Sequence, residues 1–371
     1  MKRLAVMISF SGDGGVERMV TNLCAEFAQH VHLDLLALKL DGGHAERIPA
    51  GVRLIRLNAR HAWTSVREVA DYLRMNRPDA MLVAKERAGR GALRAGRSAA
   101  SGTPIFIRLG TNLSAALERK DVLSRWLRTA PMRRAYSQAD GVIAVSEGVR
   151  QDTIKLTGIA AERVHVIRNP VITPRLHEQA AVAAPHAWLE HKSLPVILGM
   201  GRLTRQKDFE TLLRAFSALQ AELPSRLVIL GEGPQPGDRE RLETLARALG
   251  ISERLLLPGF QKNPYAWLAR ADLFVLSSAW EGSPNALTEA LALGVPCVST
   301  DCPSGPSEIL AGGRYGPLLP VGDASAMTTA MLHTLRAPRP RAELREAVAE
   351  YRADLSASRY LHLMGISTGA G

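Results

Sequence analysis

The sequence predicts an α/β protein built from two doubly wound, Rossmann-like domains, and three observations support this fold class. The chain has 371 residues, a length that suits two domains of roughly 150–200 residues each. Short apolar runs alternate with amphipathic helical patterns in both halves, an order typical of parallel sheets covered by helices. The alternation breaks once, near the middle of the chain, where prolines and alanines gather without a clear strand pattern.

The first half predicts a domain over residues 1–170. An apolar strand at 4–10 leads into a glycine turn at 12–15 and then into an amphipathic helix over 16–29. Further strands are expected at 32–40, 52–57, 80–84, 105–108 and 141–145.

The alternation restarts after an expected linker at 171–194. Strands are expected at 196–199, 227–230, 255–257, 273–276 and 296–299, with helices at 208–220, 238–249, 266–270 and 286–293. These elements predict a second domain over 195–345, and helices over 346–371 are expected to pack back toward the first domain. Two doubly wound domains in series place a cleft between the carboxyl ends of two sheets, where nucleotide-linked ligands bind.

Composition predicts a globular protein without a membrane span. Hydrophobic residues make up 46% and charged residues 22% of the chain, and no apolar run approaches the ~20 residues that cross a bilayer. The first ten residues enter the glycine turn without a cleavage site, which favours a buried strand over a signal peptide. Three scattered cysteines indicate core thiols. We therefore expect a cytoplasmic protein.

The net charge of +11 predicts anionic partners. Zinc-finger spacing and aromatic RNA-binding motifs are missing, so nucleic acid is not expected. Arg87, Arg90, Arg94 and Arg97 would share one helix face, and a second basic segment at 119–134 surrounds Trp126. These segments predict peripheral binding to an anionic membrane, on the inner face of the plasma membrane; solvated helix faces are the alternative.

The glycine turn Gly12-Asp13-Gly14-Gly15 follows a strand and opens a helix, so its backbone amides are suited to an anion. The pattern lacks the third glycine of a dinucleotide fingerprint, which argues against a dehydrogenase. A turn that only connects strand and helix is the alternative.

The segment at 199–207 carries the cations expected at a diphosphate. Gly201 at the end of a strand permits close approach of a ligand, and Arg202 and Lys207 project into the same space. Together they can neutralise a diphosphate without a metal. No two aspartates stand two apart, so the D-x-D pair that commonly holds a metal-bound nucleotide sugar is missing.

Two carboxylates, Glu281 and Glu289, flank a predicted helix start. Pro284 suits the first helical turn, so Ser283 or a neighbour is expected to cap a helix that carries Glu289, while Glu281 stays in the preceding loop. Carboxylates at two depths can bind hydroxyls of two parts of one ligand. Two solvated glutamates are the alternative.

These segments resemble the GT-B glycosyltransferases, specifically the retaining glycosyltransferase family 4. The resemblance rests on GDGGVER at the glycine turn, GRLTRQKDFETLL from 201, GEGP from 231, PGF from 258, ARADLFVLSSAWEGSPNALTEALALGVPCVSTD from 269 and SGPSEIL from 304. It covers nearly the whole chain in order, and the block with the two glutamates is its most specific part.

The resemblance implies roles for individual residues. Arg202 and Lys207 would bind the donor diphosphate, Glu281 the hydroxyls of the donor sugar and Glu289 the ribose hydroxyls. Amides near the sugar and diphosphate would come from Gly282, Ser283, Pro284, Asn285, Ala286 and Leu287; the base would lie by Phe260 and Gln261, and the diphosphate would face Gly14 and Gly15.

One departure concerns the acceptor side. Many family members carry a histidine in a loop of the first domain, whereas this chain has Ile107 to Asn112 there without a histidine. Arg108, Thr111 or Asn112 is expected to line the acceptor side instead.

The resemblance implies a metal-independent transfer of a sugar, with retention, from a nucleotide-diphosphate sugar to a glycan or lipid-linked acceptor, in polysaccharide or lipopolysaccharide assembly. No cofactor is expected, because the donor is a substrate. A nucleotide-sugar epimerase on the same scaffold and a non-catalytic sugar-nucleotide-binding protein are the alternatives.

Overall fold

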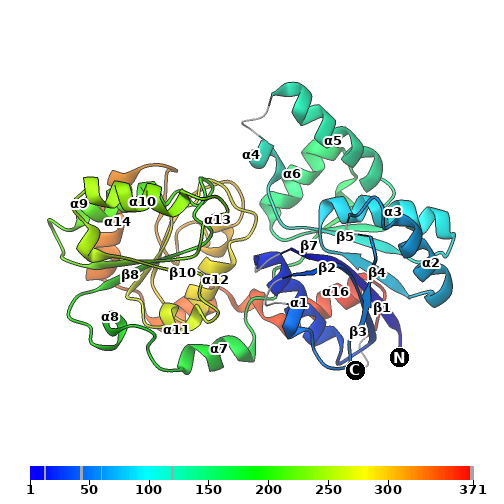
Figure 1. Cartoon of the computed structure of the whole chain (residues 1–371), viewed down its shortest axis with the longest axis horizontal. Helices are drawn as coiled ribbons and strands as arrows, with labels where there is room; N and C mark the ends of the chain where they lie inside the picture. The colour runs from blue at the N-terminus through cyan, green and yellow to red at the C-terminus, as the bar shows by residue number, and fades with distance from the viewer. Residues whose placement is uncertain (12–13, 42–44, 60, 118–120, 368–371) are drawn as a thin grey trace. The chain divides into compact units, whose positions relative to one another are not determined.

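The computed structural model describes residues 1–11, 14–41, 45–59, 61–117 and 121–367 (Figure 1). The chain forms two compact units, one of Met1–Val171 with Tyr351–Gly371 and one of Ile172–Glu350. Each unit contains one parallel sheet with helices on both faces, so the predicted α/β class with two doubly wound domains is confirmed. No helix of the described residues is both long and apolar enough to cross a bilayer.

The sheet of the first unit has seven parallel strands in the order β3-β2-β1-β4-β5-β6-β7. They are β1 (Arg3–Ser11), β2 (His32–Asp41), β3 (Arg53–Arg56), β4 (Ala80–Val83), β5 (Ile105–Leu109), β6 (Gly141–Ala144) and β7 (Val164–Val166). In the centre of the sheet, Val6 pairs with Leu35 of β2 on one side and with Leu82 of β4 on the other. Side chains alternate between the two faces along each strand, and both faces are buried at β4, β5 and β6.

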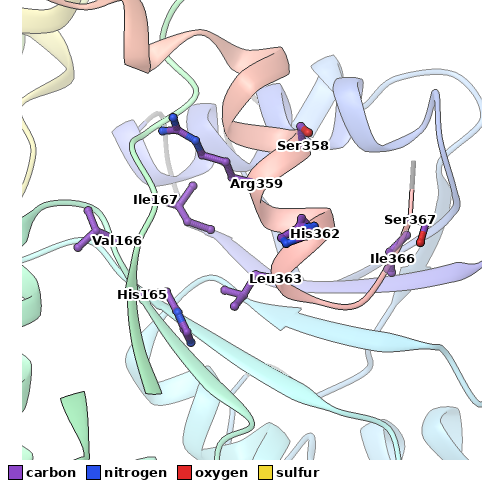
Figure 2. A pocket seen from close by; sticks show the side chains of 9 residues that line it. All are labelled: His165, Val166, Ile167, Ser358, Arg359, His362, Leu363, Ile366 and Ser367. Atoms are coloured by element: carbon purple, nitrogen blue, oxygen red, sulfur yellow. The ribbon is translucent and has the colours of Figure 1, made fainter. Parts of the chain in front are cut away.

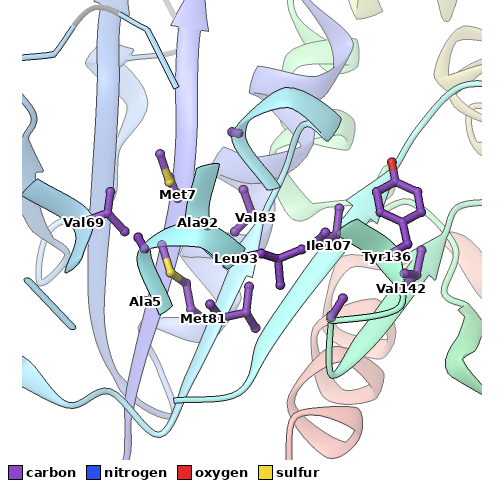
Figure 3. Packing of buried hydrophobic residues seen from close by; sticks show 14 of the residues in the cluster. Ala5, Met7, Val69, Met81, Val83, Ala92, Leu93, Ile107, Tyr136 and Val142 are labelled. Atoms are coloured by element: carbon purple, nitrogen blue, oxygen red, sulfur yellow. The ribbon is translucent and has the colours of Figure 1, made fainter. Parts of the chain in front are cut away.

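The helices of the first unit form one layer on each face of this sheet. They are α1 (Gly15–Phe27), α2 (Val66–Asn76), α3 (Glu86–Ala99), α4 (Leu113–Leu117), α5 (Val122–Tyr136), α6 (Glu147–Thr157) and α16 (Ala353–Leu363), with short 3-10 turns η1 (Ala45–Arg47) and η2 (Ala161–Arg163). On one face, α3 contributes Ala92 and Leu93 to a core that includes Met7 and Ile107 (Figure 3). On the other face, α1 and α16 pack together, with the rings of Phe27 and Tyr360 6.2 Å apart.

The sheet of the second unit has six parallel strands in the order β10-β9-β8-β11-β12-β13. They are β8 (Val196–Met200), β9 (Arg226–Leu230), β10 (Leu255–Gly259), β11 (Leu273–Leu276), β12 (Cys297–Thr300) and β13 (Leu318–Leu319). The helices are α7 (Pro174–Ala181), α8 (Ala187–Glu190), α9 (Phe209–Leu219), α10 (Asp238–Ala248), α11 (Tyr265–Leu268), α12 (Asn285–Ala292), α13 (Pro306–Ile309), α14 (Ala324–Arg336) and α15 (Arg341–Glu346), with turns η3 (Ser252–Arg254) and η4 (Ala349–Tyr351).

The segment expected as a linker, 171–194, carries regular structure. Pro174 lies in the first turn of α7, and the hydroxyl of Thr173 caps that helix by accepting from the amide of Leu176. Asn263 Nδ2 in turn donates to the carbonyl of Gln179. Pro174, one of the prolines that interrupt the strand pattern, therefore begins a helix of the second unit, to which the chain from Ile172 belongs.

Candidate functional site

The candidate donor site lies at the switch point of the second sheet. From β8 the chain proceeds outward to β9 and β10, then returns to the opposite side of β8 with β11. Open α/β sheets bind ligands outside the carboxyl ends of their strands at such a point, because the two following loops diverge there. The loop at 201–208 follows β8 and the loop at 277–284 follows β11, so both predicted charge-bearing segments lie at this position.

Two glycines allow the loops after β8 and β9 to approach each other closely. The amide of Gly201 donates to the carbonyl of Leu230 at 2.9 Å, and Gly231 has a φ of 135°. A Cβ atom on Gly231 would lie 2.0 Å from the carbonyl oxygen of Gly201, a separation that atoms do not tolerate. Glycine at position 231 is therefore required by the backbone itself, whatever the ligand.

Lys207 and Glu281 form an ion pair across the switch point. Lys207 Nζ lies 2.5 Å from Glu281 Oε1, and their side chains are 17% and 8% exposed. Ser278 Oγ donates to the same oxygen at 2.7 Å. The two loops are also joined through their backbones, because the amide of Ala279 donates to the carbonyl of Gln206 at 2.8 Å. The buried carboxylate of Glu281 thus holds the ammonium of Lys207 in place. The sequence alone predicted neither this ion pair nor the hydrogen bond from Ser278.

Cys302 lies close to this pair without being suited to nucleophilic chemistry. Burial, and secondarily the negative charge of Glu281, raises the pKa of its thiol to about 12. The thiol therefore stays protonated at neutral pH.

Arg202, one residue after Gly201, has an exposed side chain.

The second carboxylate, Glu289, is held inside the unit by α12. It is 1% exposed, and Tyr265 Oη of α11 donates to Glu289 Oε1 at 3.5 Å. Glu281 is buried as well, so the alternative of two solvated glutamates is wrong. Tyr265 gave no signal in the sequence, because its contact with Glu289 depends on packing between two helices.

The start of α12 differs from the expectation for Ser283. The residue at the cap position is Pro284, whose carbonyl accepts from the amides of Leu287 and Thr288, and no side chain caps the helix. Ser283 lies one residue too early to cap, and its buried hydroxyl has no hydrogen-bond partner among the described residues. The amide of Leu287 donates inside the helix and its side chain is fully buried, and its contact with a ligand stays a prediction.

The remaining residues of the expected amide cluster surround this helix start. Gly282 is buried in the loop before it, and Asn285 and Ala286 form its first turn. A Cβ atom on Gly305 would lie 2.6 Å from Pro284 Cδ, so the loop at 304–305 packs tightly against the same point.

Phe260 and Gln261 follow β10, at the same carboxyl edge of the sheet. Phe260 is 45% exposed, and its amide donates to Glu232 Oε1 at 3.2 Å. Gln261 Nε2 donates to the carbonyl of Pro258 at 2.9 Å. An exposed aromatic ring beside this edge is suited to stacking on a base.

In the first unit, Gly14 precedes α1 as its cap residue and Gly15 is its first residue. Gly12 and Asp13 lie outside the described residues. A Cβ atom on Gly14 would lie 2.6 Å from Glu17 Oε2, so the close neighbour of this glycine is a side chain of its own helix.

Arg108 and Asn112, the residues expected on the acceptor side, have partners inside the first unit. Arg108 is 2% exposed, and its Nη2 donates to Asn169 Oδ1 at 2.6 Å. Burial lowers the pKa of its guanidinium, and Tyr360 counteracts this shift in part. Asn112 Oδ1 accepts from the amide of Ala115 at 2.9 Å, the geometry of a helix cap for α4. Both residues have structural roles, and their contact with an acceptor stays a prediction.

The four arginines expected as one basic stripe lie on α3, yet they do not form a uniform surface. Arg90 pairs with Glu86 at 2.7 Å and is mostly buried. The guanidinium of Arg94 lies 4.4 Å from the ring centre of Trp63, which is 51% exposed. Arg87 and Arg97 are exposed. Trp63 was missed because it precedes the helix by more than twenty residues. In the second basic segment, Arg119 and Lys120 and the side chains of 122–128 lie outside the described part of the chain.

Two cavities lie away from these residues. One, of about 570 Å³, lies in the first unit between β7 and α16 and includes His165, Arg359 and His362 (Figure 2). The other, of about 640 Å³, lies in the second unit by β12 and α14 and includes Tyr315 and His333. Neither contains a predicted site residue. Among the described residues, no group of three or more His, Cys, Asp and Glu side chains is arranged to hold a metal ion.

Two family models match the chain. Residues 13–175 match the model described as Glycosyltransferase Family 4, and residues 194–337 match Glycosyl transferases group 1.

Curated relatives include several glycosyltransferases. The lipopolysaccharide 1,6-galactosyltransferase of Escherichia coli is 26% identical over 344 residues, covering 89% of this chain and 88% of the relative. The lipopolysaccharide core biosynthesis glycosyltransferase LpsE of Rhizobium meliloti is 29% identical, covering 61% and 69%. A 4-alpha-N-acetylgalactosaminyltransferase of Campylobacter jejuni is 31% identical, but the match covers only 52% of this chain and 50% of the relative. An uncharacterized glycosyltransferase of Methanocaldococcus jannaschii, 42% identical over 116 residues, is covered over only 28% of its length.

Solved structures share the fold at low identity. The HepE protein of Anabaena in complex with UDP has a TM-score of 0.77 at 18% identity, covering 98% of this chain and 100% of that one. The lipopolysaccharide outer core galactosyltransferase WaaB in its apo form has a TM-score of 0.72 at 21% identity, covering 98% and 99%. With both family models matched and this fold shared, the chain belongs to the GT-B glycosyltransferases of family 4, the glycosyl transferases group 1.

Proposed function

We propose that this protein transfers a sugar from a nucleotide-diphosphate sugar to a glycan or lipid-linked acceptor, with retention of anomeric configuration. The observation that carries the proposal is the Lys207–Glu281 ion pair at the switch point of the second sheet. It fixes one cation in the loop that also carries the exposed Arg202, at the edge where α/β sheets bind ligands.

The cations suit a donor diphosphate. A guanidinium can bind two phosphate oxygens at once, and an ammonium adds a compact charge. Because a buried carboxylate holds Lys207 in place, little reorganisation is needed when charge develops on the leaving group. The Anabaena protein of the same fold has been solved with UDP and with UDP-glucose, which supports a uridine nucleotide as the donor to test first.

The names of two relatives support the proposed acceptor class. The Escherichia coli and Rhizobium meliloti proteins are named for lipopolysaccharide and its core. A role in lipopolysaccharide or other polysaccharide assembly is therefore proposed here too. The exposed Trp63 with Arg94 stacked on it gives the first unit an aromatic and basic surface suited to an anionic leaflet, which supports peripheral attachment to the membrane.

Retention is proposed to proceed without a covalent enzyme intermediate. Glu281 is paired with Lys207 and buried, which makes it a poor nucleophile. The bond from the anomeric carbon to the diphosphate oxygen would break, the acceptor oxygen would bond to the same face of that carbon, and its proton would pass to the departing diphosphate. Stabilisation of the leaving group and positioning would supply the rate enhancement without a metal or a cofactor.

The experiment is a transfer assay with a panel of nucleotide sugars and lipopolysaccharide-core or lipid-linked acceptors, with the product linkage determined by NMR. We expect nucleoside diphosphate release that depends on acceptor and a product with the anomeric configuration of the donor. A product of inverted configuration would exclude retention. Conversion of the donor sugar to its epimer without transfer would instead identify an epimerase, and binding without turnover a non-catalytic protein.

A further inference from the structure

The cavity of about 570 Å³ in the first unit lies between the edge strand β7 and the second half of α16 (Figure 2). Its polar lining consists of His165 from β7 and of Ser358, Arg359, His362 and Ser367 from α16 and the residues that follow it. Among the described residues, no carboxylate lines it. Both walls belong to the first unit, and small-molecule sites commonly have volumes of about 300–1,000 Å³. The cavity thus has the size of a ligand site and a lining that favours negative charge.

One helix presents three of these side chains next to one another. Ser358 and His362 are four positions apart on α16, and Arg359 and His362 are three positions apart. Residues at these spacings are neighbours on a helix surface. Ser358 and His362 are exposed, and Arg359 is half-buried. A hydroxyl, a guanidinium and an imidazole can therefore contact one group of a ligand.

His165 faces the same cavity from the sheet. It pairs with Ile143 of β6, whose side chain belongs to the apolar cluster of α1 and α16, so both point to the face that α16 covers. The side chains of Ile167 and Leu363 lie between the two walls and add apolar surface (Figure 2). A ligand in the cavity would therefore meet polar groups from both walls and an apolar surface between them.

Two further cations act on this part of the unit. Burial, and secondarily the positive charge of Arg150, lowers the pKa of His165, although Arg150 also pairs with Glu147. Lys2 Nζ donates to the carbonyl of Gly365 at 2.7 Å, just after the end of α16. It adds positive charge where the partial negative charge of helix carbonyls would otherwise repel an anion. An anion in the cavity would offset the repulsion between Arg150 and a protonated His165, and a neutral group would not.

We infer that this cavity binds a phosphate monoester with an apolar substituent, at a site separate from the donor site of the second unit. A phosphate offers three terminal oxygens, enough to accept from Ser358, Arg359 and His362, whereas a carboxylate offers two. The apolar substituent covers Ile167 and Leu363. The inference goes beyond the proposed function and does not depend on it. The monoester comes from a soluble molecule or from a lipid headgroup such as that of phosphatidic acid.

The measurement is NMR of the full-length protein with ¹³C-labelled histidine, titrated with phenyl phosphate. The resonances of His165 and His362 are assigned through His165→Gln and His362→Gln, and both should shift along one binding curve. Benzyl alcohol, which lacks the phosphate, should shift neither. Arg359→Gln should raise the Kd read at these resonances roughly tenfold, the loss of one charge-assisted hydrogen bond. Arg247→Gln, which changes an exposed arginine of α10 in the second unit, is the matched control and should leave the Kd unchanged.

Sedimentation with vesicles of phosphatidic acid distinguishes the two sources. A lipid headgroup predicts that Arg359→Gln sediments less than wild type and Arg247→Gln. Equal sedimentation of all three, together with binding of phenyl phosphate that Arg359→Gln weakens, identifies a soluble ligand.

The inference is overturned if phenyl phosphate at millimolar concentration shifts neither imidazole resonance, or if folded Arg359→Gln binds it as tightly as wild type. Thermal melting identifies variants that are unfolded. Should Arg359→Gln fail to fold, His362→Gln decides, because its side chain is exposed and its loss does not disturb the core. It should raise the Kd read at His165 severalfold, and an unchanged Kd would overturn the inference.

Discussion

Lys207 and Glu281 are 74 positions apart in the sequence, yet they form an ion pair of 2.5 Å that joins the loops after β8 and β11. The two residues were expected to bind different parts of a donor, one the diphosphate and the other the sugar. Because each holds the other in place, a change in either alters the position of both.

The first prediction concerns the coupling of this pair. Lys207→Ala and Glu281→Ala should each lower turnover about 100- to 1000-fold, the usual loss for one preorganised charge. The double variant should be little worse than the poorer single variant, since both singles already disrupt one unit. Lys207→Ala should also lower the free energy of unfolding by about 3 kcal/mol, because it leaves a buried carboxylate without its cation.

A second ion pair, just before the amino-terminal ends of the same two strands, provides a matched control. Lys192 precedes β8 and pairs at 2.7 Å with Asp272, which precedes β11. Lys192→Ala should leave turnover unchanged. Fully additive losses for Lys207→Ala and Glu281→Ala in kinetic assays would show that the two act independently, contrary to the structure.

The second prediction separates the roles of the two glutamates. Glu289→Ala should raise the Kd for nucleoside diphosphate more than it lowers turnover, and Glu281→Ala should do the reverse. Tyr265→Phe should raise that Kd only roughly threefold, because the hydrogen bond that it removes from Glu289 is long and has an uncharged donor. Calorimetric titration beside steady-state kinetics checks this. Equal effects of Glu281→Ala and Glu289→Ala on binding would contradict the assignment.

The third prediction concerns metal. Arg202 and Lys207 are expected to do the work of a divalent cation at the diphosphate, so activity should survive dialysis against EDTA. The assay is turnover before and after chelation, with manganese and magnesium added back. Loss of activity that only a metal restores would overturn this description of the site.

The fourth prediction concerns the membrane. Trp63→Ala and Arg94→Ala should each reduce sedimentation with anionic liposomes, since a basic residue near an anionic leaflet contributes ~1 kcal/mol. Arg247→Ala, an exposed arginine of α10 in the second unit, is the matched control and should have no effect. Equal sedimentation with anionic and neutral liposomes at low and high salt would show that this surface is only solvated.

Local patterns predicted the fold and part of the site. Apolar periodicity located the strands other than the short edge strands β7 and β13. Gly201 was expected to permit close approach of a ligand, which stays a prediction; the structure shows that Gly201 and Gly231 bring the loops after β8 and β9 together. Contacts between distant segments could not be predicted from local patterns, because they depend on which strands or helices become neighbours. Examples are the contacts of Lys207 with Glu281, of Glu17 with Lys85 and of Trp63 with Arg94. Ser283 or a neighbour was expected to cap α12; the neighbour Pro284 has the cap position, and its carbonyl begins the helix without a side-chain acceptor.

The central claim is that the second unit binds a nucleotide-diphosphate sugar through Arg202 and Lys207. Its most direct test is thermal melting of wild type, Arg202→Ala and Lys192→Ala with a panel of nucleoside diphosphates and nucleotide sugars. A ligand at one hundred times its Kd stabilises the folded state by about 2.7 kcal/mol. We predict that at least one nucleoside diphosphate and its sugar raise the melting temperature of wild type and Lys192→Ala, and that Arg202→Ala loses most of this shift. No shift in wild type with any nucleotide, or an undiminished shift in Arg202→Ala, would contradict the claim.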